Sequence, residues 1–262
     1  MGGHAGAFID IHRGCSINCG KKYVGGSIKE AHFYERMYDL ARTGKIPKKF
    51  LSFFPKYYGI RCKKDGVSYF EIENLKTRAG NKVKTLDFKV GKKSAFKFNT
   101  GFLKNKRLGL INTLSTSSRL GFRLEGSSVS IKTHKSIPKS FKIPTPIKVP
   151  GKKYKLYSKN PFHIFDSFFS DEKSLNQTIK SLERMYNKFI VPNQDRKTHG
   201  LGFIGASILF VSGSKSSFVK MIDFAHPFVY DPANPSKNTL NVIDNMSNGV
   251  KSLLDQLKLF KL

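Results

Sequence analysis

Apolar residues recur along the first third of the chain with the spacing of short strands and one helix. Alternating or apolar runs bounded by Gly, Asp or Asn predict a set of strands. These strands are residues 7–11, 21–24, 57–60, 68–72 and 84–90. After the second of them, apolar residues at helical spacing run from Ser27 to Gly44, and Ser27 with Glu30 forms an S-x-x-E capping box. We therefore expect a β-rich first third that carries one helix.

The remainder of the chain mixes helical and strand patterns. One apolar stripe predicts a helix over residues 170–192, ending at Pro192. Two apolar strands, residues 202–211 and 218–224, are joined by a short turn and form a hairpin. A C-terminal helix is predicted from one apolar side, made of Val250, Leu253, Leu254, Leu257 and Phe260. Since no internal repeat is visible, the pattern indicates an α+β fold.

Two segments depart from these periods. Residues 91–109 interleave Lys and Arg with Phe and Leu, which favours a short helix or loop with one face for an anionic ligand. Residues 127–155 are rich in Ser, Lys and Pro, and their prolines exclude helix, so we expect a loop or an extended edge segment.

The composition excludes several classes of protein. Of 262 residues, 39% are hydrophobic and 13% aromatic, so the chain can build a sizeable core and disorder is a poor description. No apolar run approaches the roughly 20 residues of a membrane-spanning helix, and residues 1–10 lack the pattern of a signal peptide. Cys15, Cys19 and Cys62 form no even framework and have no zinc-ligand spacing. These features predict a soluble intracellular protein, cytoplasmic or nuclear.

The charge balance points to a polyanionic partner. Lys and Arg number 47 against 18 Asp and Glu, a formal net charge of +29. Nucleic acid, an acidic membrane surface and a small molecule dense in phosphate all fit such a charge. Because the basic residues are mostly Lys, a diffusely solvated surface is also consistent with it. Charge alone therefore does not select the partner.

Two strand segments each place a carboxylate within an apolar pattern. Asp87 and Lys89 lie two apart on a predicted strand, so they share one face, and Asp223 ends another strand. Phosphoryl transfer uses such an array: a carboxylate holds Mg²⁺, a Lys offsets charge on the transferred group, and a further group positions the attacking hydroxyl. A same-face salt bridge and an ordinary strand end would give the same two patterns.

Taken in order, eight segments resemble the inositol polyphosphate kinase family. They include Gly3-His4-Ala5-Gly6, like A-G-H-x-G; residues 30–35, like E-x-x-F-Y-E; and residues 222–226, which match I-D-F-A-H. The others are residues 55–59, 73–75, 87–91, 118–126 and 206–210. This resemblance implies a two-lobed, protein-kinase-like α+β fold. Residues 1–73 would form a β-rich N-lobe and residues 74–262 a mixed C-lobe, with a hinge at 73–75, an inositol phosphate-binding insert at about 92–112 and a metal-binding hairpin at 202–226.

The resemblance also implies an ATP site. Lys22, or Lys21 in the alternative register, would contact the ATP phosphates, with Glu30 orienting it unless Glu30 only caps its helix. The backbone of Glu73 and Leu75 would hydrogen-bond adenine. Asp87 would bind the ribose hydroxyls or help position the acceptor.

Metal and acceptor roles follow from the same resemblance. Asp223 would ligate Mg²⁺ with the help of the Ser207 hydroxyl, Lys89 would approach the acceptor oxygen and the γ-phosphate, and His226 would contact the substrate. Two departures from the family pattern are Val83 in place of Pro and Ala206 in place of Ser, the second of which is expected to weaken metal binding or turnover. The remaining substrate-binding residues would be Lys92, Lys93, Lys97, Lys104, Lys106, Arg107, Arg119 and Arg123.

The implied activity is that of an ATP- and Mg²⁺-dependent inositol phosphate kinase. His226 completes D-F-A-H, the form that resembles the hexakisphosphate kinase and multikinase branches, and the basic insert favours inositol hexakisphosphate as the substrate. A multikinase that phosphorylates hydroxyls of lower inositol phosphates is the alternative. A non-catalytic basic protein that binds nucleic acid or anionic membrane, and a kinase-like pseudoenzyme, are rival hypotheses. We expect a monomer that needs no nucleic acid.

Overall fold

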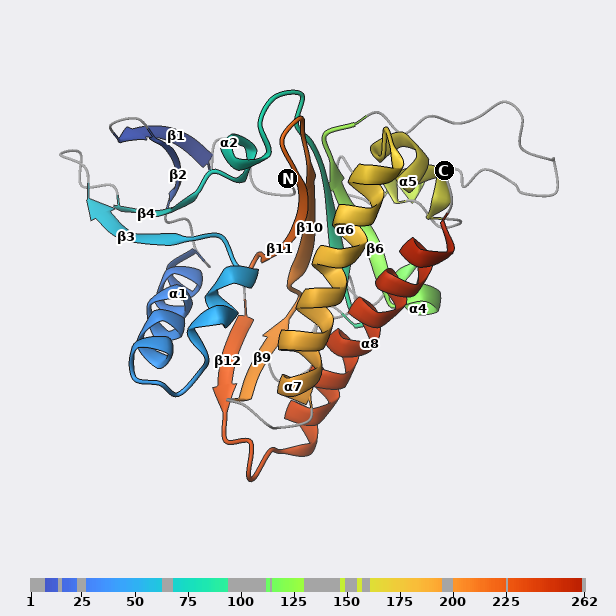
Figure 1. Ribbon diagram of the computed structural model, residues 1–262. Helices are drawn as coiled ribbons and strands as arrows, with labels where there is room; N and C mark the ends of the chain where they lie inside the picture. Colours follow the sequence, from blue (N-terminus) through green and yellow to red (C-terminus); the bar gives the residue numbers. More distant parts are fainter. Residues whose placement is uncertain are drawn as a thin grey trace.

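The structure is a computed structural model. It describes residues 8–13, 16–22, 27–62, 68–93, 112–113, 115–129, 147–148, 155–156, 161–194, 200–224 and 226–260. Figure 1 shows a strand-rich part built on the first quarter of the chain, beside a larger part in which helices cover a second sheet. The predicted two-part α+β architecture is confirmed at this level.

The first part is an antiparallel sheet with a helix packed on it. Its strands lie in the order β1-β2-β4-β3, and helix α1 and the short 3-10 helix η1 follow β2. Tyr34 of α1 stacks on Tyr57 with ring centroids 5.3 Å apart and also packs against Phe70. The elements are β1 (Phe8–Arg13), β2 (Ser16–Lys22), α1 (Ser27–Arg42), η1 (Lys48–Phe53), β3 (Tyr57–Cys62) and β4 (Ser68–Glu73).

The second part is centred on a four-stranded antiparallel sheet in the order β11-β10-β5-β6. These strands are β5 (Lys84–Val90), β6 (Phe122–Ser127), β10 (Ser207–Ser212) and β11 (Ser217–Ile222). Two smaller sheets pair β9 (Gly200–Ile204) with β12 (His226–Tyr230) and β7 (Ile147–Lys148) with β8 (Lys155–Leu156). The predicted β10–β11 hairpin is confirmed.

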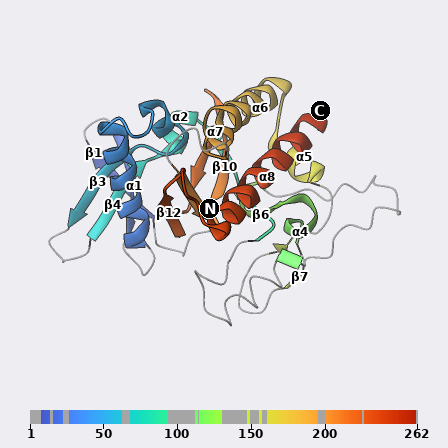
Figure 2. The ribbon, with the colours of Figure 1, turned by 90° about the horizontal axis from the view of Figure 1, so that it is seen from below.

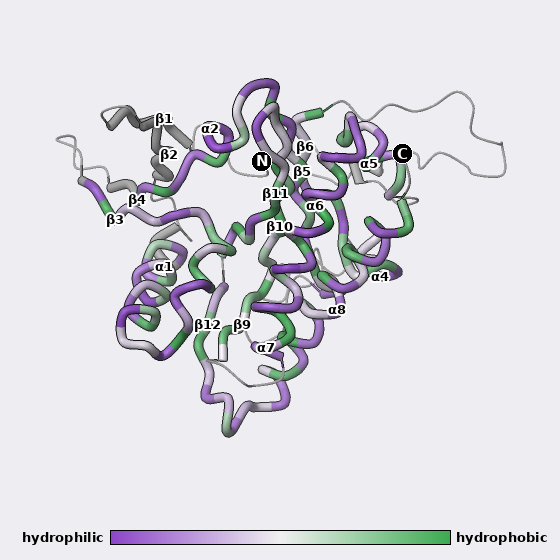
Figure 3. Tube along the Cα trace, in the orientation of Figure 1, coloured by the Kyte–Doolittle hydropathy of each residue, from purple (hydrophilic) through white to green (hydrophobic). Residues whose placement is uncertain are grey.

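Helices cover one face of the central sheet. α6 and α8 run side by side across it, as both ribbon views show (Figures 1 and 2), and the hydropathy tube is green along the central strands (Figure 3). Phe88 of β5 lies at the centre of this core, 5.1 Å from Phe210 and 6.0 Å from Phe165 between ring centroids. The helices are α2 (Leu75–Ala79), α4 (Ser117–Leu120), α5 (Phe162–Phe168), α6 (Glu172–Met185), α7 (Val191–Gln194) and α8 (Lys237–Leu259).

One predicted strand is two strands. The pattern over residues 202–211 divides into β9 and β10, because Gly205 adopts a left-handed φ of +70° and redirects the chain. β9 then pairs with β12 while β10 pairs with β5. A continuous run of apolar residues hides this break, since both strands are buried on both faces.

The predicted helix end at Pro192 is also wrong. After α6 the chain forms a π-helical turn, η2 (Tyr186–Ile190), and continues into α7, which contains Pro192. Hydrogen bonding in a π turn skips five residues and so changes which carbonyl faces the proline ring, whose missing N–H would otherwise interrupt an α-helix. Periodicity alone does not reveal such a turn.

Several elements go beyond the sequence prediction. η1, α2, α5 and β12 are short, and α8 begins at Lys237, well before the apolar side recognised at residues 250–260. Ser236 caps α8 by accepting the Thr239 N–H at 3.1 Å. Of the Ser-, Lys- and Pro-rich segment 127–155, only Ser127, Ser128, Val129, β7 and Lys155 of β8 lie within the described residues, and they are extended or irregular as expected.

Candidate active site

Strand register brings the candidate catalytic residues into adjacent rows. Lys89 of β5 pairs with Ser207 of β10 on one side and with Arg123 of β6 on the other. Asp87, two residues earlier, pairs with Leu209. Because directly paired residues point to the same side of a sheet, these side chains share one face, opposite the helices.

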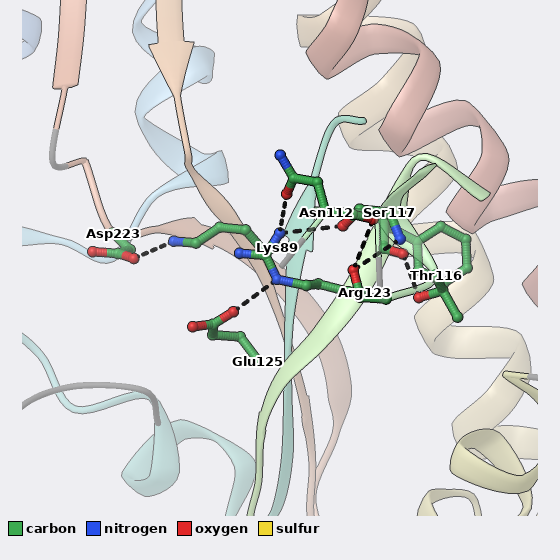
Figure 4. Close-up of polar contacts among 9 residues, drawn as sticks. Lys89, Asn112, Thr116, Ser117, Arg123, Glu125 and Asp223 are labelled. Carbon is green, nitrogen blue, oxygen red and sulfur yellow. Dashed lines mark hydrogen bonds and ion pairs between the residues drawn. The ribbon is translucent and has the colours of Figure 1, made fainter. Parts of the chain in front are cut away.

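Lys89 is the centre of this array. Its side chain is buried, and its Nζ donates to Asp223 Oδ2 just beyond β11 (Figure 4). Burial alone would lower the pKa of Lys89, but the carboxylates of Asp223 and Asp87 outweigh it and raise that pKa above its ordinary value. Lys89 is therefore held as a cation at neutral pH.

Asp223 occupies an unusual backbone conformation. Its φ is +65°, in the left-handed region that residues with a Cβ rarely adopt, and its side chain is 44% exposed. Such strain costs about 1–3 kcal/mol and is typical of functional sites, where the surrounding structure enforces it. The turn holds the Asp223 carboxylate at the exposed end of the array, where a ligand can reach it.

Asp87 is more deeply placed than Asp223. Its side chain is 4% exposed and that of Ser207 is fully buried. Burial raises the pKa of the Asp87 carboxyl, although the Lys89 ammonium and the Ser207 hydroxyl act against that rise. Asp87 thus places a buried carboxyl group beneath the exposed end of the site.

The donor set fits a divalent cation that binds together with phosphates. Asp223 could supply a carboxylate and Ser207 a hydroxyl. Across the described residues, no group of three or more His, Cys, Asp or Glu side chains is arranged to hold a metal ion. A magnesium ion commonly binds through one or two carboxylates plus substrate phosphates and water, so this small set suits Mg²⁺ carried by a nucleotide.

An apolar wall adjoins the charged array. Leu75, Leu209, Val211 and Phe218 form a small buried cluster against which Ile222 packs. Leu209 and Ile222 lie on the face that carries Asp87, so the wall is beside the charges. Leu75 was predicted as a hinge residue; the other wall residues were not recognised from the sequence, although the alternation within residues 207–222 could have identified them.

The predicted hinge, residues 73–75, lies where β4 ends and α2 begins. β4 ends at Glu73, Asn74 caps α2 by accepting the Lys76 N–H at 3.1 Å, and Leu75 is buried. The Glu73 N–H already donates to the Lys56 carbonyl at 2.8 Å. Any contact between the Glu73 backbone and adenine would therefore have to come from its carbonyl oxygen.

The remaining nucleotide residues are only partly described. Glu30 is 5% exposed on the first turn of α1. Lys21 and Lys22 pair with Phe70 and Tyr69, but the side chains of both lysines lie outside the described residues. The choice between the two lysines, and between an orienting and a capping role for Glu30, stays open.

Arg123 lies where a direct substrate contact is not expected. The residue is 2% exposed, and its guanidinium donates to Glu125 at 3.0 Å, Asn112 at 3.0 Å and Ser117 at 3.2 Å (Figure 4). A buried cation bonded to these groups braces β6 against the start of α4. The prediction of substrate binding did not anticipate this burial. Arg123 alternates with the apolar residues Phe122 and Leu124, and such alternation gives no sign that the charged side chain is buried.

The rest of the predicted substrate set is dispersed. Lys92 and Lys93 are exposed directly after β5, Arg119 is exposed on α4, and His226 is half-buried at the start of β12. Asn245 of α8 was not predicted, yet it accepts the Lys93 N–H at 3.0 Å and donates to the Lys93 carbonyl at 2.9 Å. The other four predicted residues lie outside the described residues; they are Lys97, Lys104, Lys106 and Arg107.

A strand-rich part joined by a short linker to a mixed part, with a Lys and two Asp at the junction side of the sheet, defines a kinase-like fold. Residues 69–258 match the family model described as inositol polyphosphate kinase, and the chain belongs to that family.

Solved structures show the same fold. One is the yeast inositol phosphate multikinase Ipk2 from S. cerevisiae in complex with ADP and Mn²⁺, with a TM-score of 0.62 and 20% identity over 92% of this chain and 98% of that one. A second, an inositol phosphate multikinase from a protein-engineering study, has a TM-score of 0.52 and 18% identity over 88% and 98%. A comparison with curated proteins gives no match. Over the described part of the chain, no helix is both long and apolar enough to cross a membrane.

Proposed function

We propose that this protein is an ATP- and Mg²⁺-dependent inositol polyphosphate kinase. The observation that carries the proposal is the Lys89–Asp223 pair, with Asp87 beneath it, on the open face of the central sheet in a chain of this family. A structural salt bridge would not need the strained backbone of Asp223 or a second buried carboxylate. Binding of ADP and Mn²⁺ by the yeast multikinase supports the nucleotide and metal.

The residues divide the work of phosphoryl transfer. Asp223, with Ser207, would hold the divalent cation, which neutralises charge on the β- and γ-phosphates. Lys89 would stabilise the transferring phosphoryl group and the acceptor oxygen, and Asp87 would orient the ribose or the acceptor. Leu75, Leu209 and Ile222 would form an apolar slot for adenine, with the Glu73 carbonyl at its edge.

The acceptor is proposed to be inositol hexakisphosphate. Transfer of the γ-phosphoryl group to one of its phosphates would form a P–O–P bond and release ADP. The density of Lys and Arg between Lys89 and Arg119 supports a highly phosphorylated substrate, because several point charges can surround it from different directions. A specific observation favours the alternative acceptor, a hydroxyl of a lower inositol phosphate: the two solved structures described above are inositol phosphate multikinases.

One assay separates these possibilities. Purified protein is incubated with Mg-ATP and a panel of inositol phosphates from trisphosphates to the hexakisphosphate, and products are resolved by anion-exchange chromatography and phosphorus NMR. A pyrophosphate signal from the hexakisphosphate supports the first acceptor, and new monoesters on lower members support the second. If no member gains a phosphate while Mg-ATP still binds, the protein is a pseudoenzyme and the proposal fails.

A further inference from the structure

A cavity lies at the junction of the two parts of the chain. It has a volume of about 410 Å³ and is bounded by η1, the end of β4, α2, α6 and β11. None of its lining residues belongs to the group Asp87, Lys89, Ser207 and Asp223. In strand register Leu209 of β10 separates Lys220, which lines the cavity, from Asp87. Glu73 and Phe218 line the cavity and also belong to the predicted hinge and the apolar wall, so the cavity adjoins the candidate nucleotide site without including the four residues of the Lys89 array.

The cavity wall is strongly basic. Four of its side chains are cations, Lys56, Arg78, Arg184 and Lys220, against one carboxylate, Glu73. Their formal charge is 4 − 1 = +3. The first three are exposed at the rim. A concave site with cations from one loop, two helices and a strand focuses a positive potential that a solvated surface does not.

Lys220 provides the buried base of this site. Its side chain is 4% exposed, and its Nζ donates to the Ser52 and Phe54 carbonyls at 2.6 Å and 3.0 Å. An ammonium carries three N–H donors, so these two carbonyls leave one for a ligand. Such a buried donor can form a charge-assisted hydrogen bond that rim lysines, which are fully hydrated, cannot match.

The electrostatics of Lys220 agree with the geometry. Burial lowers its pKa to about 8; Glu73 raises that pKa, whereas the charges of Arg78, Lys56 and Arg184 lower it further. Positive charge therefore accumulates at this point beyond what Glu73 neutralises. A bound anion would raise the pKa of Lys220 again.

Apolar side chains form the other half of the wall. Phe53, Phe54 and Phe218 line the cavity, and the Arg78 guanidinium lies over the Phe218 ring, 4.6 Å from its centroid. A volume near 410 Å³ lies within the range of small-molecule sites, about 300–1,000 Å³. It accommodates a ring with a phosphate group but not a folded partner.

We propose that this cavity is a second ligand site, one that binds a small phosphate monoester bearing an aromatic or apolar group. The phosphate would contact Lys220, Arg184 and Lys56, and the apolar group would pack against Phe53 and Phe218. Because η1 comes from the first part of the chain and α6 and β11 from the second, the ligand would touch both.

The test uses phenyl phosphate as the probe. Binding to the full chain is measured by isothermal titration calorimetry with saturating Mg-ADP, in wild type, in the double variant Lys56→Ala/Arg184→Ala and in the control Lys49→Ala/Lys180→Ala. The control removes two exposed charges from η1 and α6 that do not line the cavity. We expect the first double variant to lose at least about tenfold in affinity and the control to change less than about twofold.

Two further arms make the result decisive. Inorganic phosphate should bind more weakly than phenyl phosphate, and benzyl alcohol, which has the ring without the charge, should not bind measurably. Equal affinity in wild type and in Lys56→Ala/Arg184→Ala, or no binding of phenyl phosphate at all, overturns the proposal. Thermal unfolding checks that all variants fold. Since no turnover is measured, absence of kinase activity would leave this result unaffected.

Discussion

At the scale of single residues, the candidate site holds a charge triad whose net charge favours a further cation. With both carboxylates ionised, Lys89, Asp87 and Asp223 sum to +1 − 1 − 1 = −1, which would repel a nucleotide phosphate. A divalent ion held by Asp223 would reverse the sign of this net charge. This arrangement explains why a strongly basic protein nevertheless places two carboxylates at its candidate active site.

The first prediction concerns the ion pair between Lys89 and Asp223. Asp223→Asn and Lys89→Ala should each lower kcat at least about a hundredfold, since each removes a charge that acts on the transferring phosphoryl group. Thermal unfolding should show that both variants remain folded. The control Asp231→Asn, at an exposed carboxylate directly after β12, should keep wild-type kcat. Retained turnover in either site variant would refute the assignment.

The second prediction concerns the backbone of Asp223. Glycine adopts a φ of +65° without a Cβ penalty, whereas alanine does not, so Asp223→Gly should be more stable than Asp223→Ala by about 1 kcal/mol. Both variants lack the carboxylate and should be inactive, which separates strain from chemistry. Urea unfolding monitored by circular dichroism provides the measurement. Equal stability of the two would show that the turn relaxes.

At the scale of elements, α8 positions the start of the basic segment. Gly249 of α8 approaches Gly91 so closely that a Cβ on Gly249 would lie 2.4 Å from the Gly91 nitrogen. One turn earlier, Asn245 makes two hydrogen bonds to the backbone of Lys93. The helix thereby fixes the chain where it leaves β5 toward the predicted substrate residues.

A third prediction tests that positioning. Asn245→Ala should raise KM for the inositol phosphate several-fold while leaving KM for ATP and kcat within about twofold, because only the exit of the basic segment loses its anchor. Asn245→Asp keeps the acceptor for the Lys93 N–H and loses only the donor, so it should raise the same KM by a smaller factor. The exposed neighbour Asn248→Ala is the matched control. An equal rise in KM for the inositol phosphate and for ATP would indicate a purely structural role for Asn245.

At the scale of the whole molecule, one lysine links the two parts. Lys220 of β11 reaches across to the carbonyls of Ser52 and Phe54 at the end of η1. Phe224 adds an apolar link, with its ring 5.1 Å from Phe33 and 5.5 Å from Tyr34 of α1. The two parts therefore share one core.

The fourth prediction follows from the pKa of Lys220, about 8 in the folded protein against 10.5 as its ordinary value. Below pH 8 Lys220 is protonated in both the folded and the unfolded state, and its buried charge destabilises the folded state. Between about pH 8 and 10.5 the unfolded state binds more protons, so wild-type stability rises relative to Lys220→Met, by up to about 3 kcal/mol.

Denaturant unfolding of both proteins across that pH range measures this difference. An exposed lysine of α6 provides the control: Lys180→Met should give a constant difference from wild type. A flat difference for Lys220→Met would show that Lys220 titrates normally.

Much of the site could be predicted from local sequence. The spacing of Asp87 and Lys89 placed both on one face of β5, and the apolar pattern before Asp223 placed it at a strand end; both expectations are confirmed. Arg123 was predicted to bind substrate and not to lie in a buried network, because burial depends on Glu125, Asn112 and Ser117 approaching it together. Asn245 could not be found, since its partner Lys93 lies 152 residues away.

The sequence by itself determined the strand and helix periods, the charge of +29 and the motifs that identify the family, because each of these is a local property of residue types. Only the tertiary structure decided that residues 202–211 break at Gly205, that the helix passes through Pro192, and that Lys89 meets Asp223 across two strands. It also gathered Lys56, Arg78, Arg184 and Lys220 around one cavity. These features depend on register and packing between distant segments, which no local pattern encodes.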